Sequence, residues 1–378
     1  MTMRKVMASE LEDWLRDRYF EVAIDISSSG VADYRLGELL DRTSLTMAQL
    51  TELTFRDSPS LGCEALRAAV ASRFGAADPN EVLITNGSTE ALFLLLSAQL
   101  SAGDEVIVLD PVYPSLGRIP AALGARMVSW ALRPERNFEP DLDELGELLH
   151  PGVRAVLVNF PHNPTGAHLT SRQLTRLLEL TGQVGAMLIW DGAFSELVYD
   201  AQLVQPAAGS DPLVAVTGTV SKAYGLPGLR VGWCLAPPPV LAELVRIRDY
   251  VTLGTSALSE LIATAALESG DALLAPRLRQ AELNRSQLLD WAGEQPGRVE
   301  LPVPRGGVCA FPRFPGLPET TDLCARLAEQ HRTLVVPGSC FGHPDRIRLG
   351  FGGRPADLEA GLEILSRAVA DEAAVAVR

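Results

Sequence analysis

Cysteine is scarce in this chain of 378 residues, and basic side chains are outnumbered by acidic ones. The five cysteines are odd in number and widely scattered, which excludes a disulfide framework and the ligand spacing of a metal site. We therefore expect reduced thiols and a cytoplasmic protein. The formal net charge is −14, and this charge repels nucleic acid and anionic membranes.

Long apolar runs are also missing. No stretch is long enough to cross a bilayer, and residues 1–14 lack the apolar segment of a signal peptide. The content of 47% apolar and 21% charged residues is typical of soluble globular proteins. The length favours one large and one smaller domain. We expect an N-terminal arm of the small domain at 1–45, a large domain at 46–260, and a linker helix with the remaining small domain at 261–378.

What the chain does contain is an alternation of helical segments with short apolar runs that end in polar or glycine-rich loops. This order predicts an α/β protein with a mostly parallel sheet, whose ligands bind beyond the carboxyl ends of the strands. Ser9 and Glu12 predict a capping box at the start of the first helix. The predicted helices are 9–20, 64–74, 88–100, 258–289, 322–331 and 356–369. The predicted strands are 22–26, 82–85, 105–109, 155–159, 186–190, 214–217, 307–314 and 347–351.

The most specific signal is Lys222, in the segment 219–232 (TVSKAYGLPGLRVG). An isolated lysine is usually a solvated surface charge. This one follows a predicted buried strand and precedes a glycine-rich loop, and the segment resembles the Schiff-base signature of the class I and II aminotransferase family. The resemblance implies fold type I, with a seven-stranded sheet in the large domain and a smaller α/β domain from both termini. It also implies pyridoxal 5′-phosphate (PLP), bound covalently by Lys222, with Thr219 and Arg230 at its phosphate.

Two further segments resemble the cofactor site of this family. Residues 85–91 (TNGSTEA) lie between a strand and a helix, where backbone N–H groups favour a phosphate. An ordinary Asn-Gly turn is the alternative. The resemblance assigns Gly87, Ser88 and Thr89 to the phosphate, and it assigns Tyr113 to stacking on the pyridine ring. The alternative for Tyr113 is a core tyrosine.

The pyridine ring itself is expected to contact three more residues. Asn163, in an Asn-Pro-Thr-Gly segment, matches the asparagine that binds the ring oxygen, although such a sequence is also a common turn. Asp191 matches the carboxylate that keeps the ring nitrogen protonated, with a helix cap as the alternative. Phe194 stands where the family usually has a tyrosine, so a hydroxyl donor near the ring oxygen is lost.

The substrate side is less sharply defined. Arg348 matches the arginine that binds the α-carboxylate, but Arg346 lies two residues away and leaves an alternative. The resemblance places Ser29, Gly30 and Asn163 beside the substrate and implies a homodimer. Asp57 stands near the position of a tyrosine that crosses the dimer interface in relatives. It is our candidate for binding a guanidinium in the partner's pocket, with a solvent-facing loop aspartate as the alternative.

Several segments resemble a dehydrating cyclase of this family more closely than its transaminases. They are 11–20, 25–31, 55–62, 190–194 and 246–250. This resemblance implies a small-molecule substrate, 3-hydroxyarginine, which loses its β-hydroxyl as water and closes a ring through its guanidine. An aminotransferase of another amino acid remains an alternative, as does a non-catalytic PLP-binding regulatory protein.

Overall fold

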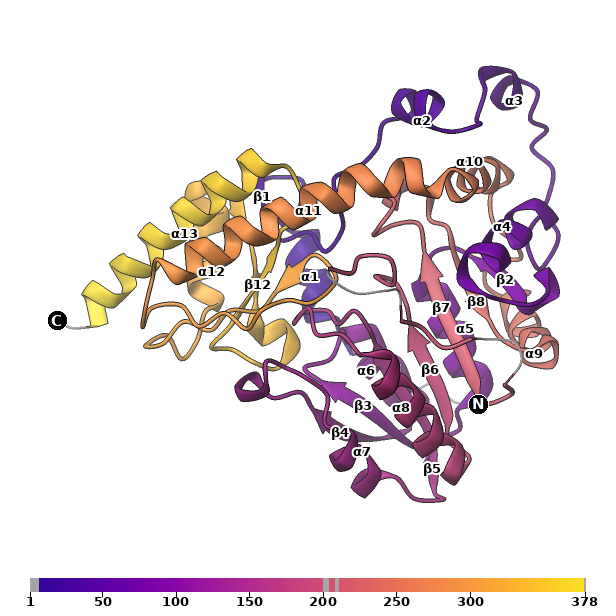
Figure 1. Ribbon diagram of the computed structural model, residues 1–378, viewed down its shortest axis with the longest axis horizontal. Helices are drawn as coiled ribbons and strands as arrows, with labels where there is room; N and C mark the ends of the chain where they lie inside the picture. The colour runs from indigo at the N-terminus through magenta and orange to yellow at the C-terminus, as the bar shows by residue number, and fades with distance from the viewer. Residues whose placement is uncertain (1–6, 200–203, 208–210, 377–378) are drawn as a thin grey trace.

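A seven-stranded sheet forms the centre of the larger part of the molecule (Figure 1). The computed structural model describes residues 7–199, 204–207 and 211–376. The strand order is β2-β8-β7-β6-β5-β3-β4, and β8 alone runs antiparallel to its neighbours. The strands are β2 (Val82–Thr85), β3 (Glu105–Asp110), β4 (Arg126–Ala131), β5 (Val153–Asn159), β6 (Met187–Asp191), β7 (Val214–Thr219) and β8 (Gly232–Leu235).

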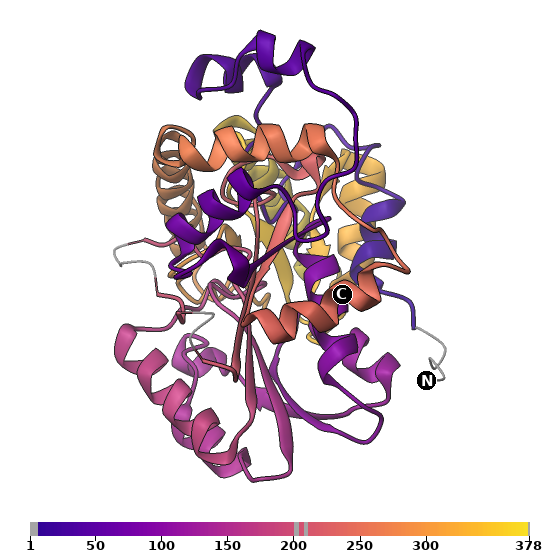
Figure 2. The ribbon, with the colours of Figure 1, turned by 90° about the vertical axis from the view of Figure 1, so that its right-hand side faces the viewer.

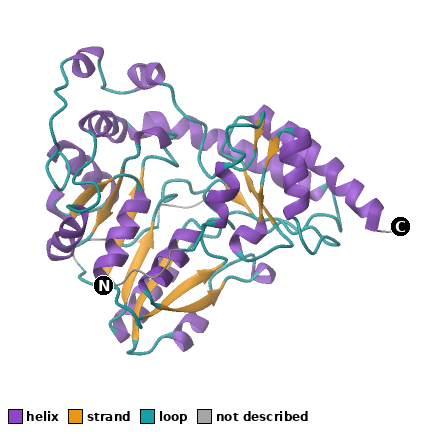
Figure 3. Ribbon diagram, turned by 180° about the vertical axis from the view of Figure 1, so that it is seen from behind, coloured by secondary structure: helices purple, strands orange, loops and turns teal. Residues whose placement is uncertain are grey.

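Helices cover both faces of this sheet, so its inner strands are apolar almost throughout rather than alternating (Figure 3). The predicted α/β class with a mostly parallel sheet is therefore confirmed. The helices around the sheet are α4 (Glu64–Phe74), α5 (Ser88–Gln99), α6 (Pro114–Leu123), α7 (Leu142–Leu148), α8 (Ser171–Val184), α9 (Pro238–Arg248) and α10 (Ala257–Glu268).

A smaller α/β unit is built from both ends of the chain. Strand β1 (Ile24–Asp25) pairs in parallel with β10 (Thr333–Leu334), and β12 (Ile347–Gly350) lies between β11 (Val336–Pro337) and β9 (Cys309–Ala310). Helices α1 (Glu10–Arg16), α11 (Gly270–Gly293), α12 (Thr321–His331) and α13 (Pro355–Ala376) surround these strands in Figure 1.

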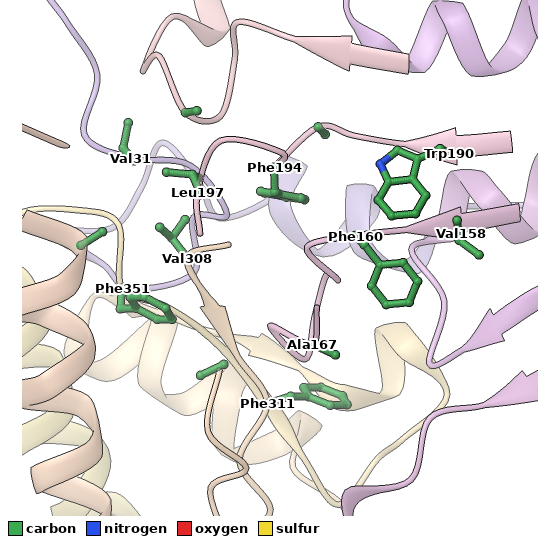
Figure 4. Packing of buried hydrophobic residues seen from close by; sticks show 14 of the residues in the cluster. Val31, Val158, Phe160, Ala167, Trp190, Phe194, Leu197, Val308, Phe311 and Phe351 are labelled. Atoms are coloured by element: carbon green, nitrogen blue, oxygen red, sulfur yellow. The ribbon is translucent and has the colours of Figure 1, made fainter. Parts of the chain in front are cut away.

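Buried apolar side chains continue from the large sheet into the smaller unit. Figure 4 shows Phe160 and Trp190 on the sheet side and Val308 and Phe351 on the other, with Phe194 between them. The ring centres of Phe160 and Trp190 lie 5.6 Å apart, so the two rings are in contact. All five belong to one continuous core, so the site described below lies against rigid packing.

Several expected elements differ in detail from the structure. The predicted capping box is wrong, because Ser9 is the N-cap of α1 but its side chain makes no capping hydrogen bond. The predicted strands 22–26 and 307–314 shrink to the two-residue strands β1 and β9. The predicted helix 258–289 is two helices, α10 and α11, which meet at Ser269.

Two short helices stand away from the body. Helices α2 (Leu36–Arg42) and α3 (Met47–Thr51) project beyond the rest of the chain in Figures 1 and 2, and only Leu39 of the two is buried. Leu36 and Met47 expose about half of their surface, at 47% and 56%. Within the part of the chain that the structure describes, none of the helices combines the length and apolarity that a membrane crossing needs.

Candidate active site

A cavity of about 830 Å³ opens where the parallel strands of the large sheet end. Strands β3, β5, β6 and β7 end at Asp110, Asn159, Asp191 and Thr219, so the loops that follow them meet at one edge of the sheet. Most residues predicted to hold PLP line this cavity. They are Ser88, Thr89, Tyr113, Asn163, Asp191, Phe194, Thr219, Lys222 and Arg230.

Lys222 lies directly after β7, with its side chain in the cavity. Its amine donates a hydrogen bond of 2.8 Å to the Ser29 hydroxyl. The backbone of the same loop is tied to Lys222, because Val31 N–H donates to its carbonyl at 3.1 Å. Burial lowers the pKa of the Lys222 amine, and the charge of Arg348 lowers it further. A neutral amine is the form that attacks an aldehyde or accepts a proton.

The residues predicted to bind the phosphate of PLP form a tight turn of the backbone at one end of the cavity. Gly87 has φ +79° and ψ 167°, a region that only glycine adopts easily. A Cβ at Gly87 would lie 2.6 Å from the Arg230 guanidinium, and one at Gly232 would lie 2.5 Å from the backbone nitrogen of Ser88. Helix α5 begins at Ser88, so its free N–H groups and the guanidinium converge on the same space.

The predicted ring end carries a buried carboxylate. Asp191 is 3% exposed, and its Oδ1 accepts hydrogen bonds from Ala193 N–H at 3.1 Å and Thr217 Oγ1 at 3.4 Å. Burial raises the pKa of Asp191 to about 6. A cationic ring nitrogen would favour the ionised carboxylate.

Asn159 organises the same end, although the sequence analysis gave it no role. Its side-chain amide donates to the Asp191 carbonyl at 2.9 Å and its Oδ1 accepts from Asn163 N–H at 2.9 Å. It therefore fixes the chain positions of both predicted ring-binding residues. Its place at the end of β5, in the family segment, was the available signal.

Two aromatic rings line the cavity. The Lys222 amine lies 5.7 Å from the centre of the Phe194 ring, which is 4% exposed and offers no hydrogen-bond donor. Tyr113 is the N-cap residue of α6, and burial raises the pKa of its hydroxyl to about 12. The Tyr113 hydroxyl therefore stays protonated at physiological pH, and the two rings give the cavity flat apolar walls.

The two candidate arginines point to different places. Arg348, in β12, donates to Asn163 Oδ1 at 3.3 Å and to the Ser27 carbonyl at 2.9 Å. Its Nε is buried without a hydrogen-bond partner among the described residues, so it retains a donor for a carboxylate. Arg346 donates to the Phe311 carbonyl and lines a separate cavity. The geometry favours Arg348.

Asp57 lies outside the cavity of its own chain, on an exposed segment. Ser29 and Gly30 adjoin the cavity through Lys222, since a Cβ at Gly30 would contact the Ser221 carbonyl at 3.4 Å. Several other lining residues had no role predicted from the sequence, among them Glu12, Asn86, Arg118, Ser221 and Thr252.

The donor set fits PLP. One cavity is lined by a lysine that can react with an aldehyde, a buried carboxylate and two aromatic rings. At its other end, the turn at Gly87 and a guanidinium can bind a phosphate. The cavity volume lies within the usual range for small-molecule sites, roughly 300–1,000 Å³. Among the described residues there is no cluster of side chains that would hold a metal ion.

Comparisons with known proteins agree with this site. Residues 39–365 match the family described as aminotransferase class I and II. The chain is 51% identical to capreomycidine synthase of Streptomyces vinaceus, over 95% of this chain and 93% of that protein.

Two solved structures superimpose closely. The PLP-dependent cyclase OrfR has a TM-score of 0.92 and 40% identity, covering 98% of this chain and 99% of that one. A PLP-dependent aminotransferase from Streptococcus suis also has a TM-score of 0.92, at 28% identity, covering 97% and 99%. The family resemblance expected from Lys222 and the surrounding motifs is thereby confirmed, and the chain belongs to the class I and II aminotransferase family.

Proposed function

We propose that this protein is a PLP-dependent dehydrating cyclase that converts (2S,3S)-3-hydroxyarginine to capreomycidine in antibiotic biosynthesis. The observation that carries the proposal is the 51% identity to capreomycidine synthase over almost the whole chain. The structural likeness to the cyclase OrfR supports the same class of reaction. The reaction removes one molecule of water and forms one ring, with no net oxidation or reduction.

The residues around the cavity divide into three groups. The phosphate of PLP is held by Gly87, Ser88, Thr89, Thr219 and Arg230. Asp191 binds the ring nitrogen and Asn163 binds the ring oxygen. Tyr113 and Phe194 flank the ring. Bound PLP supplies an electron sink for the pair left at the substrate α-carbon when its proton is removed.

Lys222 then acts as the base. Its pKa is lowered by burial, so a neutral amine is available to accept the α-proton. Ser29, 2.8 Å away, orients this amine. Loss of the β-hydroxyl with a proton gives water, and a terminal guanidine nitrogen adds to the β-carbon and closes a six-membered ring. Lys222 returns a proton to the α-carbon. Nucleophile and acceptor belong to one bound molecule, which favours closure.

Arg348 binds the α-carboxylate in this proposal. Its Nη1 lies 3.3 Å from Asn163 Oδ1, and its Nε, which has no hydrogen-bond partner among the described residues, provides a donor for a two-pronged contact. This contact fixes the amino acid at one end and directs its α-carbon toward Lys222.

An aminotransferase is the second candidate function, favoured by the likeness to the Streptococcus suis enzyme. Mass spectrometry of the products from 3-hydroxyarginine separates the two. The proposal expects a product lighter by one water, with no keto acid and no conversion of the cofactor to its amine form. Lys222→Ala should abolish this product and still bind PLP weakly. A borohydride-reduced peptide map that places the pyridoxyl group on another lysine would contradict the assignment.

We also propose a homodimer and the two-domain division stated from the sequence, with boundaries near residues 45 and 260. Large apolar side chains are exposed at Phe55 (80% exposed), Tyr250 (93%) and Leu253 (68%), and the segment of the last two lines the cavity at Val251 and Thr252. The two segments that carry them are in contact, because Arg248 donates to the Ser60 carbonyl at 2.8 Å. A partner subunit would cover this surface, and Asp57 lies on it.

A further inference from the structure

The cavity that contains Lys222 is lined by three acidic side chains, Glu12, Glu90 and Asp191. If the substrate carries a guanidinium, as the proposed function requires, one carboxylate must lie where that cation ends. The three are not equivalent, because they differ in what already binds them.

Two of the three carboxylates are already used. Asp191 is buried at the ring end and accepts hydrogen bonds from Ala193 and Thr217. Glu90 accepts from the backbone and side chain of Asn86 and from Thr252, and its carboxylate lies 4.0 Å from Arg248. Both oxygens of Glu90 therefore have partners, and Asp191 is assigned to the ring nitrogen of PLP.

Glu12 differs from both. Among the described residues its carboxylate makes no hydrogen bond and no ion pair, and the expected capping box with Ser9 does not form. Burial is the main cause that raises the pKa of Tyr113 and lowers the pKa of Lys222, and the charge of Glu12 adds to the first shift and opposes the second. Glu12 is exposed to solvent and lines the same cavity as Lys222, so it stands at the mouth of that cavity.

The backbone under Glu12 is rigidly placed. Leu11 and Trp14 on the same helix are buried, and the Trp14 indole donates to the Val335 carbonyl at 2.9 Å. The cavity-lining Arg118 does not neutralise Glu12, because it pairs with Glu10 at 2.5 Å. A carboxylate on a fixed helix at the cavity mouth can define the length and charge of a substrate.

We propose that Glu12 binds the guanidinium of the substrate in the cavity of its own chain. This inference rests on the proposed function and replaces Asp57 as the candidate partner. Arg348 binds the α-carboxylate at one end of the substrate and Glu12 the guanidinium at the other. Glu12 is a specificity residue, and the chemical steps remain with Lys222.

The test compares the binding of L-arginine and L-citrulline to the PLP-loaded enzyme, followed through the absorbance of the cofactor. Citrulline has nearly the same shape but carries no charge. We expect the wild type to prefer arginine by about 10- to 100-fold, the range for a hydrogen bond to a charged partner. Glu12→Gln should reduce this preference to near one without changing citrulline affinity. Glu12→Asp should restore part of it.

Asp13→Asn is the matched control, since Asp13 lies on the same helix but pairs with Arg16 at 2.6 Å. It should keep the arginine preference. An unchanged preference in Glu12→Gln overturns the inference, as does a preference lost in Asp57→Asn but kept in Glu12→Gln. Failure of the proposed function is recognised separately, because the wild type would then form no dehydrated product from 3-hydroxyarginine.

Discussion

Phe194 places a ring without a hydroxyl beside the lysine that binds the cofactor, 5.7 Å from its amine. Relatives usually have a tyrosine here, which donates to the ring oxygen of PLP and favours its anionic form. Phe194→Tyr should therefore move the pH titration of the cofactor's absorbance to lower pH while PLP stays bound. Phe194→Leu adds no donor and serves as the control. The idea is wrong if the tyrosine lies within hydrogen-bonding distance and the titration curve stays the same.

Asp191 gives a pH dependence to the stability of the cofactor-free protein. Burial raises its pKa from 3.8 to about 6, so ionisation disfavours the folded state. Its contribution to stability is lost as pH rises from about 4 to 6, by about 3 kcal/mol in total. Asp191→Asn cannot ionise. In urea unfolding, the free energy of unfolding of Asp191→Asn relative to that of the wild type should increase by about 3 kcal/mol between pH 4 and pH 7. Parallel stability curves would refute this account.

At the scale of elements, the junction between β2 and α5 depends on Gly87. A side chain there is strained at φ +79° and would lie 2.6 Å from the Arg230 guanidinium. Gly87→Ala should therefore weaken PLP binding about 5- to 150-fold, at a cost of roughly 1–3 kcal/mol. Gly103→Ala is the control, because its φ is +94° but nothing lies within 4 Å of the added Cβ. Cofactor titration should separate the two. Equal PLP affinity in both variants would contradict this explanation.

The same elements show what the sequence can and cannot predict. Strand β2 and helix α4 have the predicted bounds, because apolar runs and periodicity are local properties. Strand β1 is shorter than predicted, since its pairing depends on β10, some 300 residues away. The cofactor residues follow from motifs at strand ends. The position of Glu12 does not, because the elements that place it in the same cavity as Lys222 are remote in sequence.

At the scale of the whole molecule, the exposed apolar surface around Tyr250 predicts association. Tyr250→Asp should dissociate the homodimer, and sedimentation velocity would show a monomer of reduced activity, since an unpaired charge at a buried interface is costly. Leu283→Asp on α11 is the control, because Leu283 is 67% exposed on another element. A fully active monomer of the wild type would exclude the proposed dimer.

The two parts of the site are encoded at different places along the chain. Residues that we assign to the phosphate and the ring fall within 87–230, whereas the carboxylate contact needs residues 27–30 together with Arg348. A chain is synthesised from its N-terminus, and its domains generally fold as units in that order. During translation the cofactor-binding residues therefore emerge well before Arg348 does. The residues that hold PLP are thus synthesised first, and the set of residues that binds the amino acid is complete only once Arg348 has been synthesised.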